Sequence, residues 1–356
     1  MGASSRLRLM QYIPELENEE VNIEVFPFFD DKHLNSQYGN TKSTIFDIIK
    51  YFYNRFYILR LRSAPDLIWL EYEVLPWIPW FIEKLLLPRG VPIISDYDDA
   101  IFHRYDSHRF KTVRFLLGNK IKTIMKNSKL VIAGNSYLAD YARKSHSRNI
   151  EIIPTVVNLD VYKTKNSKKN KKIRVGWIGT PMTFDTYLQS NLPMLESLAL
   201  SEDFQITIMG AKKNISHLYP LIEFEDWSED KEVSFIQSLD IGIMPLNDSP
   251  WARGKCGYKI VQYMACGIPV VASQVGVNRN IVKHEINGFL TKTKHDWKKY
   301  IKILANDSNL RQQMGNEGRK LVEIEFSLQS WSPRIRDMFQ EIVYKNNLNK
   351  FKNNKI

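Results

Sequence analysis

The chain of 356 residues has few cysteines, no long apolar run and no apolar leader. Its two cysteines, Cys256 and Cys266, are ten residues apart, with no CxxC motif or His/Cys cluster near them. This pattern gives little support to a disulfide or a zinc site, so we expect a reduced, cytoplasmic setting. No stretch approaches the roughly 18 apolar residues of a membrane span. The start, MGASSRLRLM, lacks the apolar core of a signal peptide.

The formal net charge of +11 indicates an anionic partner. Nucleic acid is not expected, because no helix-turn-helix, zinc-finger or RNP pattern is present. Two segments, 46–62 (FDIIKYFYNRFYILRLR) and 109–126 (RFKTVRFLLGNKIKTIMK), mix cations with large apolar residues. Such helices lie on anionic membrane surfaces, and residues 109–126 are the expected contact at the inner face of the plasma membrane. In the alternative, each segment packs its apolar stripe on the core and leaves its charges in water.

Short apolar runs alternate with longer helical patterns along the whole chain, which is typical of doubly wound parallel sheets. The length is comfortable for two domains of roughly 150 to 180 residues. Strands are expected near 21–26, 67–70, 91–95, 129–133 and 150–153, and then near 173–178, 205–209, 220–224, 240–245, 269–273 and 288–291.

A basic stretch at 163–172 separates the two series and indicates a linker, because it has no apolar residue to bury. The predicted domains are therefore 1–162 and 173–325, followed by a last helix at 326–344 and a frayed polar tail at 345–356. In open α/β sheets, ligands bind outside the carboxyl ends of the strands. We therefore expect the site in a cleft between the domains.

The most informative segment is 240–290. It predicts a strand at Ile241–Leu246, a polar loop, a helix opening at Gly257, and a second strand at Val270–Ser273. The start of a helix presents unpaired N–H groups and the positive end of the helix dipole, so it binds phosphate well.

Three cations, Arg253, Lys255 and Lys259, surround this helix start. Arginine supplies a fixed fork of donors and lysine a mobile point charge, and the amides around Gly257 and Tyr258 would add backbone donors. If the helix begins slightly early, Lys255 and Lys259 lie on one face. Together these groups suit a departing nucleotide diphosphate. The alternative is a basic loop beside an ordinary buried α/β unit.

The run KIVQYMACGIPVVASQVG (259–276) resembles the donor-binding signature of the retaining glycosyltransferases of family four, the glycosyl transferases group 1. GWIGTP (176–181) resembles the glycine turn that opens their second domain. The segments PIISDYDDAIFHRYD (92–106) and VIAGNSYLADYA (131–142) resemble first-domain elements of a subgroup in bacterial surface-polysaccharide assembly, such as capsule and lipopolysaccharide.

This resemblance implies the GT-B fold: two Rossmann-like domains facing across a cleft, with the last helix crossing back to pack on the first domain. Trp331 and Phe339 would then be packing residues. It also implies retaining transfer from a nucleotide-diphosphate sugar to a glycan or polyprenyl-linked acceptor. Neither a metal nor any other cofactor is expected.

The chain departs from the family signature at two positions. Gly254 and Gln262 stand where the family has glutamates that contact the donor sugar and the ribose. Gln262 can still bond a diol, whereas Gly254 offers only backbone. The lysine often found after the glycine turn is also missing, and Lys255 and Lys259 are expected to replace it. These losses motivate a second hypothesis, a non-catalytic homologue that binds nucleotide sugars or docks on membranes.

The turn at Gly179 and Thr180 is the second predicted donor contact. Glycine has no side chain, so the backbone there can approach the phosphates closely. The alternative is a plain strand-to-helix turn.

Asp98 is the predicted catalytic residue. Aligning PIISDYDD with the family pattern puts Asp98 at the active-site histidine, where it would bind a sugar hydroxyl or help the acceptor lose its proton. Asp96-Tyr97-Asp98 also has the form of a metal-binding Asp-x-Asp. We discount a metal, because GT-B enzymes generally need none. In the alternative, these carboxylates cap the next helix or pair with His103, Arg104 or Arg109.

Residues 2–8, GASSRLR, resemble the acceptor loop that follows the family's first strand. Ser4, Ser5 and Arg6 are therefore the predicted acceptor contacts, and a helix N-cap is the alternative for either serine. The resemblance implies that the family's first strand is missing here, so that either the true start lies upstream or the first domain is compromised. Glu71 and Glu73 follow the strand LIWL and are expected to be surface carboxylates, with a position facing the cleft as the alternative.

Overall fold

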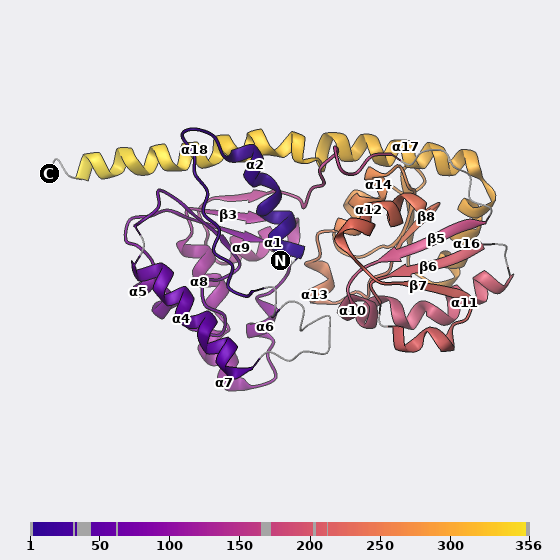
Figure 1. Cartoon of the computed structure of the whole chain (residues 1–356), viewed down its shortest axis with the longest axis horizontal. Coiled ribbons are helices and arrows are strands. Elements are labelled where there is room, and N and C mark those ends of the chain that lie inside the picture. The colour runs from indigo at the N-terminus through magenta and orange to yellow at the C-terminus, as the bar shows by residue number, and fades with distance from the viewer. Residues whose placement is uncertain are drawn as a thin grey trace. The chain divides into compact units, whose positions relative to one another are not determined.

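The computed structural model describes residues 3–30, 33, 44–61, 63–164, 172–201, 204–211 and 213–353 (Figure 1). The chain forms two compact units. Unit 1 comprises Met1–Thr155 and Trp331–Ile356, and unit 2 comprises Val156–Ser330. Each unit is an α/β structure built on a parallel sheet.

The described sheet of unit 1 has four parallel strands in sequence order. They are β1 (Ile68–Glu71), β2 (Ile93–Tyr97), β3 (Leu130–Ala133) and β4 (Ile150–Ile152). The register pairs Glu71 with Asp96, so the carboxyl ends of β1 and β2 lie side by side. Four predicted strands of the first half are thereby confirmed. The helices of unit 1 include α1 (Ala3–Arg8), α2 (Ile13–Leu16), α4 (Ile45–Leu61), α5 (Trp80–Leu86), α6 (His103–Asp106), α7 (Lys111–Leu117), α8 (Lys120–Asn127) and α9 (Ser136–Lys144).

The strand predicted near 21–26 is wrong. Val21 makes only an isolated bridge to Asn18, and residues 22–27 form no regular element. The alternating pattern there has no neighbouring strand to satisfy its backbone groups. The predicted loop at 2–8 is also different, because Ala3–Arg8 is helix α1.

The basic segment 109–126 is two helices, not one. α7 ends at Leu117 and α8 begins at Lys120, with Gly118 and Asn119 between them. In α8, Ile121, Ile124 and Met125 are almost completely buried. For α8 the alternative of core packing is therefore correct.

Unit 2 contains a six-stranded parallel sheet in the order β10-β9-β8-β5-β6-β7. The strands are β5 (Ile173–Ile178), β6 (Phe204–Met209), β7 (Ile222–Glu225), β8 (Ile241–Met244), β9 (Val270–Ser273) and β10 (Gly288–Thr291), as the sequence predicts. The helices include α10 (Pro181–Thr183), α11 (Leu192–Ser201), α12 (Glu229–Ser238), α13 (Pro250–Arg253), α14 (Tyr258–Ala265), α15 (Asn278–Ile281), α16 (Lys294–Asn306) and α17 (Ser308–Glu325).

Both faces of this sheet are covered by packed side chains. Val175 and Trp177 of β5 belong to one core cluster, and Ile178 belongs to the other. The neighbouring β5 and β8 are the pair at which the strand order reverses. Ligands of open α/β sheets bind at such switch points, just beyond the strand ends.

The boundary between the units lies earlier than predicted. Residues 156–164 belong to unit 2, because Val157 pairs with backbone on both sides of Ser327 and Tyr162 is buried in the unit 2 core. The predicted linker at 163–172 falls mostly outside the described residues.

The last helix, α18, runs from Leu328 to Asn353, so most of the tail predicted to fray is helical. From Trp331 onward it belongs to unit 1, where Phe339 packs edge-on against Trp69 with ring centroids 4.9 Å apart. Farther along, Asn346 donates to the Gly90 carbonyl, which holds the polar end in place. Among the described helices, none is long and apolar enough to cross a bilayer.

Candidate functional site

A cluster of polar side chains lies at the carboxyl ends of β1 and β2, where α1 meets them. The Ser4 hydroxyl donates to Asp98 Oδ2 at 2.8 Å, and the Tyr72 hydroxyl donates to Asp98 Oδ1. Tyr72 follows β1 with a left-handed backbone (φ 62°), which is uncommon for a residue with a side chain. Strain of this kind concentrates at functional sites. The structure thus joins Ser4 and Asp98, two residues that the sequence singled out separately, and Ser4 comes from a helix and not a loop.

Arg8 of α1 and Asp96 of β2 form a buried ion pair inside unit 1. Arg8 Nη2 lies 2.8 Å from Asp96 Oδ1, and the two side chains are 3% and 2% exposed. Trp69 Nε1 donates to the other carboxylate oxygen at 3.2 Å. Burial raises the pKa of Asp96, and the Arg8 guanidinium opposes that rise. Asp96 therefore anchors α1 to the sheet.

Glu71 is the most perturbed carboxyl group of this cluster. Burial raises its pKa to about 7, the hydrogen bond from Ser5 opposes the rise, and the charges of Asp98 and Asp96 add to it. Ser5 Oγ donates to Glu71 Oε2 at 2.5 Å. The two serines are thus bonded to carboxylates, not used as helix caps. A carboxyl group with a pKa near neutrality can both give and take a proton.

The expectation that Glu71 and Glu73 are surface carboxylates is wrong. The Glu73 side chain is 4% exposed and pairs with Lys120 at 2.7 Å. Lys120 also pairs with the fully buried Glu83 at 2.8 Å. This buried triad ties α5 and α8 to the end of β1, so Glu73 has a structural role.

On unit 2, Gly257 opens α14 as predicted. Its φ of +69° favours glycine, and an added Cβ would lie 2.5 Å from Ile281 Cδ1. The three predicted cations lie around this helix start. Lys255 precedes α14 and lies between α13 and α14, so it does not share a helical face with Lys259.

Arg253 and Lys259 contact other groups of unit 2. Arg253 Nε donates to Asp248 Oδ1 at 2.7 Å, and both side chains are half exposed. Lys259 Nζ lies 5.5 Å above the ring of Trp177, which is the penultimate residue of β5. Tyr258 is the residue before Lys259, and its hydroxyl oxygen lies 3.4 Å from the hydroxyl oxygen of Tyr162. Lys259 therefore lies against the switch-point strand β5, and Arg253 lies beside the loop that follows β8.

The turn after β5 is closed by its own hydrogen bonds. The Gly179 amide donates to the Met209 carbonyl at 3.1 Å, and the Thr180 amide donates to Thr183 Oγ1 at 2.9 Å. Thr180 also caps α10 through its side chain. An added Cβ at Gly179 would lie 2.2 Å from the Trp177 ring. This geometry favours the plain-turn alternative, and phosphate binding by these two residues stays a prediction.

Gln262 lies inside unit 2, 3% exposed. Its Nε2 amide donates to Glu232 Oε1 at 2.9 Å and to the Tyr162 hydroxyl at 2.8 Å. Trp227 donates to the other oxygen of Glu232. Gly254, at the other substituted position, is also buried. The amide predicted to bind the ribose or sugar is thus engaged with protein groups.

Sequence reasoning missed Arg8, Tyr72 and Glu232. A helix-period reading of residues 3–8 would have placed Arg8 one turn from Ser4 and Ser5, on the same side. No local signal marks Tyr72 or Glu232, because their partners lie 26 and 30 residues away in sequence. Arg6 lies in α1 beside these groups, and its acceptor role stays a prediction.

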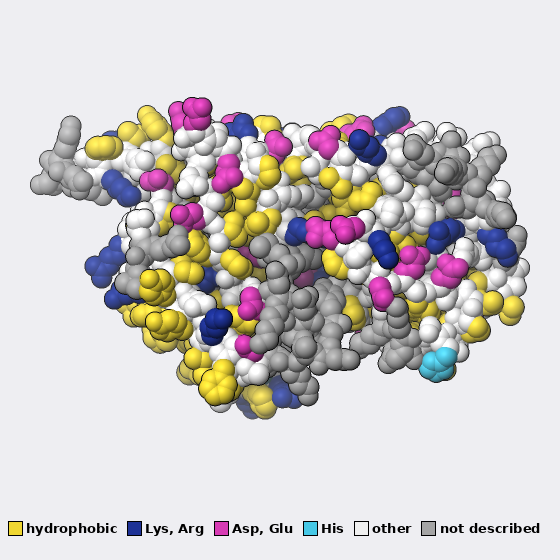
Figure 2. Space-filling model, in the orientation of Figure 1, with side chains coloured by type: hydrophobic (Ala, Val, Ile, Leu, Met, Phe, Trp, Pro, Cys, Tyr) yellow, Lys and Arg dark blue, Asp and Glu magenta, His cyan; other side chains and the backbone are white. Residues whose placement is uncertain are grey.

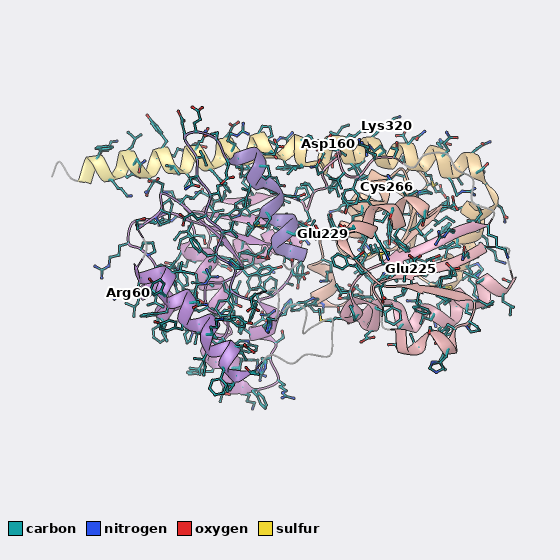
Figure 3. All side chains as sticks on the ribbon, viewed as in Figure 1. Arg60, Asp160, Glu225, Glu229, Cys266 and Lys320 are labelled. Carbon is teal, nitrogen blue, oxygen red and sulfur yellow. The ribbon has the colours of Figure 1, made fainter. Side chains whose placement is uncertain are left out.

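No cluster of three or more metal-ligand side chains occurs within the described ranges. The two carboxylates of Asp96-Tyr97-Asp98 face different partners, Arg8 for Asp96 and Ser4 with Tyr72 for Asp98. Both cysteines are reduced and buried, and burial raises the pKa of the Cys266 thiol to about 12 (Figure 3).

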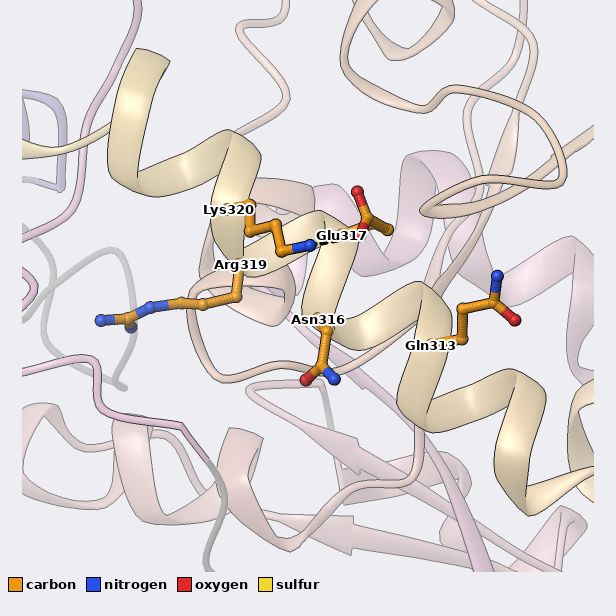
Figure 4. A pocket seen from close by; sticks show the side chains of 5 residues that line it. All are labelled: Gln313, Asn316, Glu317, Arg319 and Lys320. Atoms are coloured by element: carbon orange, nitrogen blue, oxygen red, sulfur yellow. Dashed lines mark hydrogen bonds and ion pairs between the residues drawn. The ribbon is translucent and has the colours of Figure 1, made fainter.

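A pocket on α17 is separate from all the predicted site residues. It is lined by Gln313, Asn316, Glu317, Arg319 and Lys320 (Figure 4). Glu317 and Lys320 pair across it at 2.7 Å, whereas the Arg319 guanidinium donates to backbone carbonyls. We assign it no role in the chemistry.

Comparisons with known proteins support a likeness to the glycosyl transferases group 1, the coarser part of the prediction. Residues 195–321, all within unit 2, match the family model for glycosyl transferases group 1. An uncharacterized glycosyltransferase of Methanocaldococcus jannaschii is 29% identical over 133 residues, which cover 37% of this chain. The match spans about a third of that relative's length (35%).

Solved structures resemble the chain over a longer range. Sucrose-phosphate synthase from Thermosynechococcus elongatus has a TM-score of 0.68 at 17% identity, covering 87% of this chain and 82% of that one. Anabaena HepE in complex with UDP and glucose has a TM-score of 0.59 at 17% identity, covering 77% of each chain. The chain therefore has the GT-B fold, and its unit 2 carries the sequence pattern of the glycosyl transferases group 1.

Proposed function

We propose that the protein is a retaining glycosyltransferase that takes a sugar from a nucleotide-diphosphate sugar. The acceptor would be a glycan or a lipid-linked saccharide of cell-surface polysaccharide synthesis. The observation that carries the proposal is the match of residues 195–321 to glycosyl transferases group 1, in a unit whose cations gather at the start of α14.

Unit 2 would bind the donor. The leaving diphosphate needs positive charge that is in place before the bond breaks, and Arg253, Lys255 and Lys259 supply it near a helix start. HepE has been solved with UDP and with UDP-glucose. A uridine nucleotide is therefore the first ligand to test.

Unit 1 would supply the acceptor side. Asp98 is held by Ser4 and Tyr72 beyond the end of β2, with Glu71 next to it. In this role Asp98 binds a sugar hydroxyl, and Ser4, Ser5 and Arg6 contact the acceptor. The departing phosphate would assist deprotonation of the acceptor, so the reaction needs no separate base and no metal.

The second candidate is a homologue that binds nucleotide sugars without transferring the sugar. It is supported by the burial of Gly254 and by the internal hydrogen bonds of Gln262, at the two positions where the family has glutamates. The two candidates differ in turnover, not in binding.

The deciding experiment is a thermal-shift screen with UDP-, GDP-, ADP- and CMP-sugars, with and without EDTA. A ligand of the native state raises the melting temperature by mass action. We expect one nucleotide series to stabilise the wild type but not Lys255→Ala, with no effect of EDTA. Lys298→Ala is the matched control. Lys298 is an exposed lysine of unit 2 in α16, a helix that contains none of the predicted donor contacts. Absence of any shift in a protein that melts cooperatively would contradict the donor site.

Turnover is then measured as release of the nucleotide from the stabilising donor. Release that falls at least about tenfold in Asp98→Asn supports transfer chemistry, because the variant loses a charge-assisted hydrogen bond to the sugar hydroxyl, worth about 1.5–3 kcal/mol. Binding without release in the wild type would establish the second candidate.

A further inference from the structure

Three helices of unit 1 leave large apolar side chains in water. Phe46, Ile49 and Tyr53 of α4, Leu85 of α5, and Phe115 and Leu116 of α7 are between 59% and 88% exposed. Ile45, Ile49, Tyr53 and Tyr57 are four residues apart, so they form one stripe along α4. Exposed apolar groups in this number mark an interaction surface. We call the exposed sides of α4, α5 and α7 the docking face.

The docking face is continuous. α4 contacts α5 directly. Before α5, the ring of Trp77 lies 5.8 Å from that of His108, and His108 lies 5.4 Å from Phe110 at the start of α7. Figure 2 shows hydrophobic side chains gathered with Lys and Arg side chains where Figure 1 places α4 and α7.

The charges of the docking face have one dominant sign. Lys50, Arg60, Lys84, Arg109 and Lys111 are exposed on or beside the three helices, and Arg60 points away from the fold (Figure 3). By contrast, both acidic residues of these helices, Asp47 and Glu83, are bonded within the chain. Asp47 caps α4 through Thr44, and Glu83 is fully buried against Lys120.

The segment that contains α7 and α8 has no acidic residue from 107 to 139. Within it, α8 turns its apolar side into the core, whereas α7 turns Phe115 and Leu116 outward. Folding therefore splits the basic segment into a packed helix and an exposed one. The exposed one has apolar tips between cations, the arrangement of an interfacial helix.

We propose that the docking face binds the surface of a bilayer that contains anionic lipids. The aromatic and aliphatic side chains would enter the headgroup region, and the flanking cations would contact lipid phosphates. A protein partner fits less well, because protein interfaces are depleted in lysine. Nucleic acid fits less well, because phosphate contacts leave the apolar side chains uncovered. The proposal is independent of the glycosyltransferase assignment.

The test is flotation of the full chain with vesicles of phosphatidylcholine alone and of phosphatidylcholine with phosphatidylglycerol in equal parts. We expect binding only to the anionic vesicles. In Phe115→Ser with Leu116→Ser, binding should fall at least about tenfold, because two apolar groups no longer enter the lipid. In Arg109→Glu with Lys111→Glu, binding to the anionic vesicles should fall by about fivefold or more for each cation lost.

The matched controls change equally exposed residues of unit 2. Leu200→Ser with Ile324→Ser removes comparable apolar groups, and Lys298→Glu reverses a comparable charge. Both should bind vesicles like the wild type. Three results would overturn the proposal: no binding to anionic vesicles, an equal loss in the controls, or self-association in ultracentrifugation that Phe115→Ser with Leu116→Ser abolishes while vesicle binding persists. The last would assign the face to a second copy of the chain.

Discussion

Gln262 and Glu232 share a hydrogen bond of 2.9 Å inside unit 2, and Tyr162 donates to the same carboxylate oxygen. The position where the family signature has a glutamate therefore already faces a carboxylate in this chain. Two carboxylates at that distance cannot both be ionised in a buried site without a large cost. The amide of Gln262 and the carboxylate of Glu232 are complementary as donor and acceptor. The presence of Glu232 therefore accounts for a neutral residue at position 262.

Gln262→Glu, which restores the family residue, should therefore destabilise unit 2. We expect a loss of about 2–4 kcal/mol at pH 8, because one buried carboxyl group must stay protonated or repel the other. Adding Glu232→Gln exchanges the two groups and should recover most of that loss. Urea unfolding of both variants measures it. If Gln262→Glu alone is as stable as the wild type, the two side chains do not face each other as described.

Arg8→Ala should destabilise unit 1 strongly, since it leaves Asp96 buried without its cation. Breaking one partner of a buried pair costs about 3–5 kcal/mol. The control is Arg143→Ala, which removes a pair with Asp140 whose side chains are more than half exposed and should cost less than about 1 kcal/mol. Equal losses for the two variants in urea unfolding would contradict an anchoring role for Arg8.

Glu71 should make stability depend on pH. Its pKa is raised from 4.5 to about 7, so the folded state retains a proton that the unfolded state releases. The protonated carboxyl group contributes fully below pH 4.5, and this contribution falls as the pH rises toward 7. Glu71→Gln keeps the acceptor for Ser5 without the charge. It should match the wild type near pH 4 and exceed its stability at pH 8 by up to about 3 kcal/mol. A difference that is constant between those pH values would contradict the raised pKa.

Much of the fold follows from local patterns in the sequence. Ten of the eleven predicted strands exist. Short apolar runs ended by polar turns are typical of parallel strands, because both faces of a parallel sheet are buried. The strand at 21–26 failed since its alternation matches a strand but no neighbour pairs with it. The end of α18 was predicted too early, because local composition does not record long-range contacts such as the hydrogen bond from Asn346 to the Gly90 carbonyl.

The candidate site was less predictable. Residue type and family pattern singled out Asp98 and Ser4, which the fold then joins, and placed Gly257 at the start of α14. The partners that set the chemistry, such as Arg8 for Asp96 and Glu232 for Gln262, come from distant segments. Only the folded chain brings such groups together, and burial then changes the pKa of Glu71 in a way that its neighbours in sequence do not show.

Asp248 should compete with the donor diphosphate for Arg253. The carboxylate lies 2.7 Å from Arg253 Nε and is half exposed, so a phosphate can displace it, at the cost of this ion pair. Exposed pairs of this kind are worth about 0.2–1 kcal/mol, so Asp248→Asn should tighten UDP binding by up to about fivefold. Arg253→Ala should weaken it, and the double variant should bind like Arg253→Ala alone, because Asp248 acts only through that arginine. Calorimetric titration with UDP measures all three. If Asp248→Asn changes the affinity equally in the presence and absence of Arg253, Asp248 does not act through the arginine. If Arg253→Ala leaves the affinity unchanged, the arginine does not bind the diphosphate, and the donor site must rely on Lys255 and Lys259.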